Sequence, residues 1–197
     1  MTELSPSLAA VATLRAEILD IYLGNAVRPY GLYGLNQLQH ALQSAAHAEE
    51  QGLSSAMVLA CLLHDVGHMI HDLGEAPAED GIDDAHEALG ANWAAARFVP
   101  ALSEPIRLHV AAKRYLCTVD PAYEARLAKD SRISLALQGG HMTDAELTTF
   151  LAKPWAQDAL HLRRIDELAK DKHAVTDPLE AFLDRHLSPE LMVSIAP

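Results

Sequence analysis

The sequence predicts an all-α fold, a helical bundle made by a single domain that covers residues 1–197. Half of the residues are hydrophobic, and Ala and Leu are frequent, so the chain can bury a core of its own. Apolar residues recur at helical spacing through most of the chain, and no stretch alternates in the manner of a β-strand. There is no internal repeat and no low-complexity tract.

Start and stop signals divide the first part of the chain into three helices. Ser5-Pro6-Ser7 precedes the first helix, Gly52 ends the second, and Ser54 or Ser55 begins the third. A loop with three glycines and Pro29 separates the first two. The expected helices cover residues 8–23, 35–51 and 55–67.

The rest of the chain is also predicted to be helical, in shorter pieces. Leu73 to Gly81 is polar and broken by glycine and proline, which indicates a surface loop. Asp83 or Asp84 begins a fourth helix, and Pro105 suits the first turn of a fifth. After Tyr115 we expect helices over residues 121–129, 131–138, 143–151, 155–171 and 178–186, with a sharp break at Gln138-Gly139-Gly140.

Composition narrows the classes of function. A net charge of -12 argues against a nucleic-acid face or an anionic membrane surface, since both select for basic patches. It does not argue against a small anionic substrate, because bound metal cations can dominate the local field. The two cysteines, Cys61 and Cys117, have no CxxC spacing, so neither a disulfide framework nor a zinc finger is expected.

The chain shows no targeting or membrane signal. Its first twenty residues lack a basic segment followed by an apolar core, and no apolar run approaches the ~20 residues of a membrane span. We therefore expect a cytoplasmic protein, and the sequence leaves its oligomeric state open.

Imidazoles and carboxylates at suitable positions predict a metal site. The apolar run LACLLHDVGH carries an adjacent His-Asp pair, and neutral imidazoles with carboxylates suit iron, manganese or zinc. One open catalytic metal usually takes about three protein ligands, so the six candidates suit two metals that share Asp65. The candidates are His40, His64, Asp65, His86, His109 and Asp166.

Other histidines are expected to be structural or exposed, because the chain has 11 in all. His47 follows His40 by seven residues on nearly the same helix face and could be mistaken for a ligand. The remaining ones without a convincing partner are His71, His141, His161, His173 and His186.

The order of these residues resembles that of the HD-domain superfamily, a helical metal-binding fold whose ligands run H…HD…D. His86 and His109 match the subset that binds two metals. The stretches NQLQHALQSA, MVLACLLHDVGH, HVAAKRYL, SRISLALQGG and LRRIDELAK are similar to those of the mixed-valence diiron oxygenases that degrade organophosphonates. This similarity spans roughly residues 30–170.

The resemblance implies an Fe(II)/Fe(III) pair with O2 as co-substrate and assigns a ligand set to each iron. His40, His64, Asp65 and Asp166 would hold the first iron, and Asp65, His86 and His109 the second. Tyr30 matches a tyrosine that ligates the second iron until substrate displaces it.

The resemblance also implies a phosphonate pocket. His68 lies four residues after His64, and Lys113 four after His109, so each sits beside a candidate ligand at helical spacing. Cations in such places make sense if an anion binds between them. The alternative is that Lys113 and Arg163 are ordinary surface cations. Positions matching the phosphonate contacts of the family are His68, Lys113, Ser131, Gln138 and Arg163, and Ser134 offers a further hydroxyl.

One departure from the family bears on the substrate. Where the aminophosphonate enzyme has an acidic residue for the substrate's ammonium, this chain has Tyr33. An aromatic face suits a quaternary ammonium, which has no N–H to donate. The expected substrate is (R)-1-hydroxy-2-(trimethylammonio)ethylphosphonate, cleaved to glycine betaine and phosphate. The alternative is that Tyr33 only packs and the substrate is a primary amine, 2-amino-1-hydroxyethylphosphonate, bound by an acid of the loop from Leu73 to Gly81 such as Glu75, Glu79 or Asp80.

Three rival functions use the same predicted ligands or fold. A metal-dependent HD phosphohydrolase would need the same six residues and would attack a phosphoester with a metal-bound hydroxide. A diiron oxygenase acting on a cyclitol would not need so many phosphonate contacts. A non-catalytic helical regulatory domain is less compatible, because such domains tend to lose ligands and this chain keeps all six.

Overall fold

The computed structural model describes residues 7–25, 29–30, 34–70 and 84–193. These residues confirm the all-α prediction, because helices make up nearly all of their regular structure. The first six helices are α1 (Leu8–Asn25), α2 (Gln37–Glu50), α3 (Ser55–Leu63), α4 (Val66–Ile70), α5 (His86–Ala95) and α6 (Pro100–Val119). They are followed by α7 (Pro121–Arg126), α8 (Lys129–Leu137), α9 (Asp144–Leu151), α10 (Ala156–Leu168), α11 (Leu179–His186) and the short 3-10 helix η2 (Pro189–Leu191).

Besides shifts of a few residues at several helix ends, the structure differs from the prediction at three places. Strands β1 (Pro29–Tyr30) and β2 (Leu35–Asn36) form a small antiparallel pair that was not expected, since two-residue strands are too short to show an alternating pattern. The expected helix over residues 55–67 is interrupted after Leu63, so that the His-Asp pair lies between α3 and α4. Pro105 lies inside α6 and Pro100 takes the first position of that helix.

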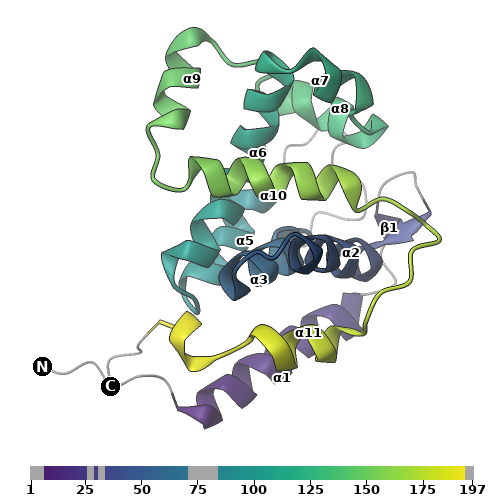
Figure 1. Cartoon of the computed structure of the whole chain (residues 1–197), viewed down its shortest axis with the longest axis vertical. Coiled ribbons are helices and arrows are strands. Elements are labelled where there is room, and N and C mark those ends of the chain that lie inside the picture. Colours follow the sequence, from purple (N-terminus) through teal and green to yellow (C-terminus); the bar gives the residue numbers. More distant parts are fainter. Residues whose placement is uncertain (1–6, 26–28, 31–33, 71–83, 194–197) are drawn as a thin grey trace, which may run out of the picture.

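The helices are stacked in tiers (Figure 1). α7, α8 and α9 lie together at one end, and α10 runs across beneath them. α2 and α3 pack against each other in the middle, and α1 and α11 lie at the other end. α6 packs against both α5 and α10, which are its most extensive neighbours.

Two hydrophobic clusters form the core, and two helices contribute to both. The larger cluster holds Ile106 of α6 and Ile165 of α10, together with residues of α1 to α5 and α11. The smaller cluster, toward α7 to α9, holds Leu116 of α6 and Leu160 of α10. Because α6 and α10 join the clusters, we propose that the chain is one domain.

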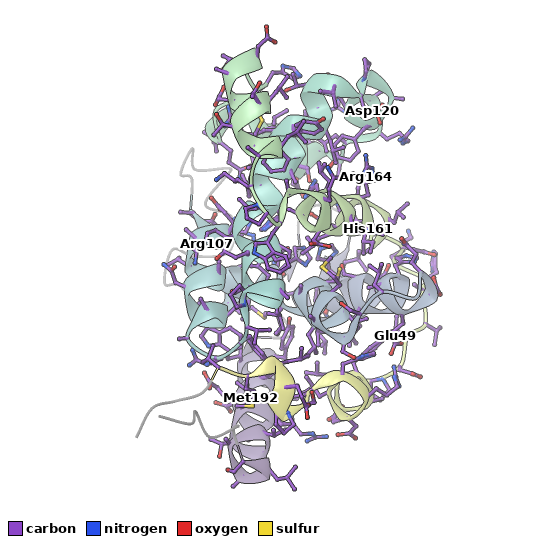
Figure 2. All side chains as sticks on the ribbon, turned by 60° about the vertical axis from the view of Figure 1, so that its left-hand side comes forward. Glu49, Arg107, Asp120, His161, Arg164 and Met192 are labelled. Atoms are coloured by element: carbon purple, nitrogen blue, oxygen red, sulfur yellow. The ribbon has the colours of Figure 1, made fainter. Side chains whose placement is uncertain are left out.

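α10 separates an exposed face from a buried one. His161 and Arg164 lie on the outer side of this helix in Figure 2. Leu162, Arg163 and Asp166 are buried. A charged pair on the buried face of a helix is unusual, since such groups need partners there.

Two glycines let the backbones of α4 and α5 approach closely. A Cβ on Gly67 would lie 2.0 Å from the carbonyl oxygen of His86, which no real structure allows. A Cβ on Gly90 would lie 3.2 Å from the backbone nitrogen of Gly67. The contact brings the His64–His68 segment against the start of α5, where His86 lies.

We predict that Gly67→Ala destabilises the fold by about 3 kcal/mol or more, because the backbones of α4 and α5 would have to separate. Gly24→Ala is the matched control, since a Cβ there meets nothing within 4 Å and the exposed position lies in α1. Its stability should change by less than about 1 kcal/mol, in the stabilising direction. Urea unfolding followed by circular dichroism measures both, and equal midpoints for the two variants would contradict the close-approach argument.

Candidate metal centre

Four buried histidines from different helices direct their Nε2 atoms toward one point. The Nε2 atoms of His40, in α2, and His64, after α3, are 3.2 Å apart. Those of His86, the first residue of α5, and His109, in α6, are 3.1 Å apart. All four side chains are buried.

The Asp65 carboxylate lies between these two histidine pairs. Its Oδ2 is 3.7 Å from Nε2 of His40. Its Oδ1 is 3.4 Å from Nε2 of His64, 3.8 Å from that of His86 and 3.9 Å from that of His109. One carboxylate therefore faces all four imidazoles.

Asp166, from α10, is a third candidate ligand next to His40 and His64. Its Oδ1 is 3.4 Å from Nε2 of His40, and its Oδ2 is 3.9 Å from Nε2 of His64. The candidate donors thus form two sets that share Asp65: one with His40, His64 and Asp166, the other with His86 and His109.

The opposite ring nitrogen of each histidine is held by an oxygen that can only accept a hydrogen bond. Nδ1 of His40 donates to the carbonyl of Ala169 at 2.9 Å. Those of His64 and His109 donate to the carbonyls of Cys61 at 2.8 Å and Ile106 at 2.7 Å. Nδ1 of His86 donates to the Asp84 carboxylate at 2.8 Å. A neutral imidazole held in this way has its lone pair on Nε2.

A cation between the facing lone pairs would relieve their repulsion. Burial lowers the pKa of His64 and of His109, which keeps their Nε2 atoms unprotonated. Metal bonds of about 2.0–2.2 Å place neighbouring ligand atoms about 3.0–3.6 Å apart, close to the spacings within each set. The donors therefore fit two metal ions that share a carboxylate, and anchored Nδ1–H groups are the usual support for metal-binding histidines.

Both central carboxylates are held in the ionised form. Burial by itself raises the pKa of Asp65, but the surrounding histidines, His64 first, outweigh it and the net pKa is lowered. Burial also opposes ionisation of Asp166, where Arg163 and then Lys170 bring the pKa well below its ordinary value. Anionic oxygens are what a metal pair needs as ligands.

Arg163 is the centre of a buried network beside Asp166. It forms an ion pair with Asp166 and donates from Nε to the hydroxyl of Tyr123 at 2.8 Å. Its Nη2 donates to Oγ of Ser131 at 3.2 Å and to Oε2 of Glu167 at 3.0 Å. The alternative of an ordinary surface arginine is therefore excluded, because only 4% of Arg163 is exposed.

Lys113 is buried one helical turn after His109, so it is not a surface lysine either. Its Nζ donates to Oγ of Ser134 at 2.8 Å. Burial, followed by the charge of Arg163, lowers the pKa of Lys113 to about 7. A bound anion next to Nζ would stabilise the charged form of Lys113.

The predicted phosphonate contacts of α8 lie on one helix face. Ser131 contacts Arg163, and Ser134 contacts Lys113, so this face meets both buried cations. Gln138 follows at the end of α8, and its Oε1 is buried without a hydrogen-bond partner among the residues that the structure describes. The structure thus gathers Ser131, Ser134, Lys113 and Arg163, and Gln138 directly follows the same helix.

Two predicted residues cannot be placed in the centre. The backbone of Tyr30 lies in β1, but its side chain lies outside the described part of the structure. Tyr33 lies outside it entirely, as do His71 and the loop acids Glu75, Glu79 and Asp80.

The structure adds four residues that the sequence analysis missed: Asp84, Tyr123, Glu167 and Lys170. Asp84 was noticed only as a possible helix start, and its side chain binds His86. Lys170 lies 3.7 Å from Asp166 and 2.9 Å from Glu167. Its position four residues after Asp166 is the same helical spacing that singled out His68 and Lys113, and could have identified it.

Other histidines lie outside the centre. His47 pairs with Glu50 and His141 with Glu124, both at the surface. His161 contacts Gln51, and His186 contacts Glu49. These contacts agree with the structural role expected for them.

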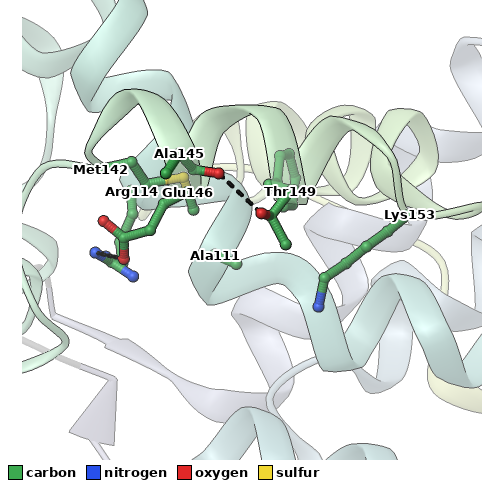
Figure 3. A pocket seen from close by; sticks show the side chains of 8 residues that line it. Ala111, Arg114, Met142, Ala145, Glu146, Thr149 and Lys153 are labelled. Carbon is green, nitrogen blue, oxygen red and sulfur yellow. Dashed lines mark hydrogen bonds and ion pairs between the residues drawn. The ribbon is translucent and has the colours of Figure 1, made fainter.

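A separate hollow of about 300 Å³ lies between α6 and α9 (Figure 3). Arg114, Glu146, Thr149 and Lys153 line it, together with apolar side chains that include Phe150. None of the predicted site residues lines it, and Arg114 and Glu146 are already paired at 2.8 Å.

Comparison with known proteins gives the chemistry of this fold. No family model matches the chain. It is 41% identical over 149 residues to a hydroxymethylphosphonate dioxygenase of Gimesia maris, covering 75% of this chain and 74% of that protein. It is 38% identical over 132 residues to the [1-hydroxy-2-(trimethylamino)ethyl]phosphonate dioxygenase (glycine-betaine-forming) of Leisingera caerulea, covering 67% of each chain. A third relative, 32% identical over 148 residues, is an uncharacterised protein of Acanthamoeba polyphaga mimivirus.

The chain belongs to the HD-domain phosphonate dioxygenase family. It is therefore an oxygenase, as the sequence predicted, and its chemistry involves a metal and O2. This removes the regulatory domain from the rival readings. None of the described helices is long and apolar enough to cross a membrane.

We predict that His64→Ala weakens metal binding at least tenfold, because it removes a donor next to Asp65 and Asp166. His47→Ala is the matched control. His47 lies in α2, but its side chain pairs with Glu50 at the surface, away from the centre. Metal content after anaerobic dialysis against Fe(II), measured by mass spectrometry, compares both with the parent. Equal metal content in the parent and His64→Ala would contradict the geometry of the centre.

Proposed function

We propose that this protein is a diiron dioxygenase that cleaves the C–P bond of a 1-hydroxyalkylphosphonate. The observation that carries the proposal is the shared Asp65 carboxylate, which lies within 4 Å of four imidazole nitrogens. The overall reaction balances with O2 as the oxidant: R–CH(OH)–phosphonate and O2 give R–COOH and phosphate.

We assign the first iron to His40, His64, Asp65 and Asp166, and the second to Asp65, His86 and His109. Tyr30 is proposed as a displaceable ligand of the second iron. When bound as an Fe(II)/Fe(III) pair, the irons would supply the electrons that O2 activation requires and Lewis acidity toward substrate oxygens.

The chain's own residues hold the phosphonate next to the metals. Lys113 and Arg163 are buried cations that contact one face of α8 through Ser134 and Ser131. A phosphonate between them would receive charge-assisted hydrogen bonds in a site shielded from water. Its carbon C1 would then be fixed relative to the irons, which lowers the entropic cost of the reaction.

Gln138 and His68 complete the proposed anion pocket. The buried Oε1 of Gln138 has no partner in the described structure, so its amide group can turn toward a ligand. His68 is only partly buried, and its Nε2 lies 4.0 Å from Oδ1 of Asp65. We assign it to the border between the metals and the proposed anion pocket.

For the substrate, we propose (R)-1-hydroxy-2-(trimethylammonio)ethylphosphonate, with glycine betaine and phosphate as products. Tyr33 in place of an acid removes the partner of a primary ammonium and offers an aromatic face to a quaternary one. The relative from Leisingera caerulea is named for this reaction.

A second candidate is hydroxymethylphosphonate, which would give formate and phosphate. The relative from Gimesia maris is named for this substrate. Because this phosphonate carries no amino group, it also needs no acidic residue at position 33. Both candidates are compatible with the same metals and the same anion pocket.

Turnover of three phosphonates side by side tests the proposal. The Fe(II)-reconstituted protein should release phosphate from the trimethylammonio substrate at least tenfold faster than from the amino or the hydroxymethyl compound, with one O2 consumed per phosphate. Fastest turnover of hydroxymethylphosphonate would select the second candidate. Phosphate release that continues without O2 would contradict the oxygenase reaction and favour hydrolysis.

We further predict that anion binding depends on the charge of Lys113. Because the pKa of Lys113 is lowered to about 7, the lysine is charged below pH 7 and loses its charge as the pH rises above it. Affinity for the phosphonate should therefore fall between pH 6.5 and 8.5 in the parent. Lys113→Arg stays charged over this range, so its profile should show only the titration of the ligand. Calorimetry measures both, and parallel pH profiles would contradict a titrating lysine in the pocket.

A further inference from the structure

A carboxylate behind the metal centre contacts two imidazoles at once. Oδ1 of Asp84 accepts from Nδ1 of His86 at 2.8 Å. Oδ2 of Asp84 lies 2.7 Å from Nδ1 of His68, within ion-pair distance. The aspartate is buried, with 8% of its surface exposed, so these contacts are formed away from bulk water.

The backbone around Asp84 is strained in a way that serves these contacts. Ala85 has a φ of 48°, and it is the one non-glycine residue with positive φ in the described part of the chain. An alanine in this left-handed region is unfavourable. The turn lets Asp84 fold back across the start of α5, where Oδ1 also accepts from the backbone N–H of His86 at 3.3 Å. Strain of this kind concentrates at functional sites.

The two imidazoles that Asp84 holds are stacked on each other. Their ring centroids are 3.9 Å apart and the planes differ by 21°. The close approach of Gly67 to the carbonyl of His86 makes this stacking possible. Both Nε2 atoms then face Oδ1 of Asp65, at 3.8 Å from His86 and 4.0 Å from His68.

We propose that Asp84 is a positioning residue that fixes His86 toward the second metal and His68 toward the phosphonate, and so couples the two binding sites. The inference rests on the proposed function, because it takes the metals and the anion from there. An ionised carboxylate is the group that can accept from both Nδ1–H groups at the same time. With both Nδ1 positions held, both rings present Nε2 to the centre.

Two binding measurements without turnover test this role. The first is titration of the metal-free protein with Co(II), whose absorption reports each bound ion. The second is calorimetric titration of the metal-loaded protein with inorganic phosphate. In Asp84→Ala, the affinity for the second metal and the affinity for phosphate should each fall 10- to 100-fold, the usual effect of removing the support of a metal ligand.

Two other variants separate the roles of the two imidazoles and of the aspartate. His68→Ala should lose affinity for phosphate only and still bind two metals. Asp120→Ala is the matched control for an aspartate at a helix start, since Asp120 accepts from the backbone N–H groups of Ala122 and Tyr123 as Asp84 accepts from that of His86. It should keep the parent's affinity for both probes.

Asp84→Asn is the milder variant if Asp84→Ala does not fold. An amide offers one acceptor and one donor in place of two acceptors, so it can hold only one of the two Nδ1–H groups. At least one of the two affinities should then fall tenfold. Parent-like affinity for both probes, or loss of the second metal in His68→Ala, would overturn the inference while leaving the proposed function intact. A parent protein that binds fewer than two Co(II) ions would instead contradict the proposed function itself.

Discussion

The buried Asp65 carboxylate, faced by four imidazole nitrogens, is the constraint on which the rest of the structure depends. Lone pairs crowded in this way are unfavourable in a protein interior unless a cation lies among them. The Nδ1–H groups on the opposite side of the four imidazole rings donate to the backbone carbonyls of Cys61, Ile106 and Ala169 and to the carboxylate of Asp84. These contacts hold the imidazoles close to the directions that two metals need.

The ends of the helices and the closest contacts between them position the residues of this centre. The interruption between α3 and α4 lets His64 and Asp65, adjacent in sequence, face the centre together. The C-terminal end of α10 supplies the Ala169 carbonyl for His40, which turns an unpaired helix-end group into a support. Where α4 meets α5, Gly67 removes the side chain that would otherwise keep His86 away. Metal affinity and fold stability are therefore linked through the same contacts.

The sequence was sufficient for the fold class, and the six residues that it predicted as metal ligands lie together in the structure. Helical periodicity identified most helices, and the order H…HD…D, through its resemblance to the HD-domain superfamily, selected the candidates among the 11 histidines. Spacing of four residues placed Lys113 next to His109, and the structure shows it buried there. Helical periodicity and four-residue spacing are local features, so a pattern along the chain can reveal them.

The parts that the sequence did not reveal depend on long-range or strained geometry. The left-handed backbone at Ala85 directs Asp84 to two imidazoles. Such a conformation is usually predicted from a glycine, and here the residue is an alanine. Tyr123 meets Arg163 across 40 positions of sequence, and a two-residue strand pair leaves no periodic signal. The break after Leu63 falls within an uninterrupted apolar run, so periodicity alone continued the helix to Gly67.

The most direct test of the shared-carboxylate centre is anomalous diffraction at the iron edge from crystals of the anaerobically reconstituted protein. The account predicts two peaks on either side of the Asp65 carboxylate, about 3.5–4 Å apart, one next to His40, His64 and Asp166 and the other next to His86 and His109. A single peak, or two peaks that do not both contact Asp65, would contradict it.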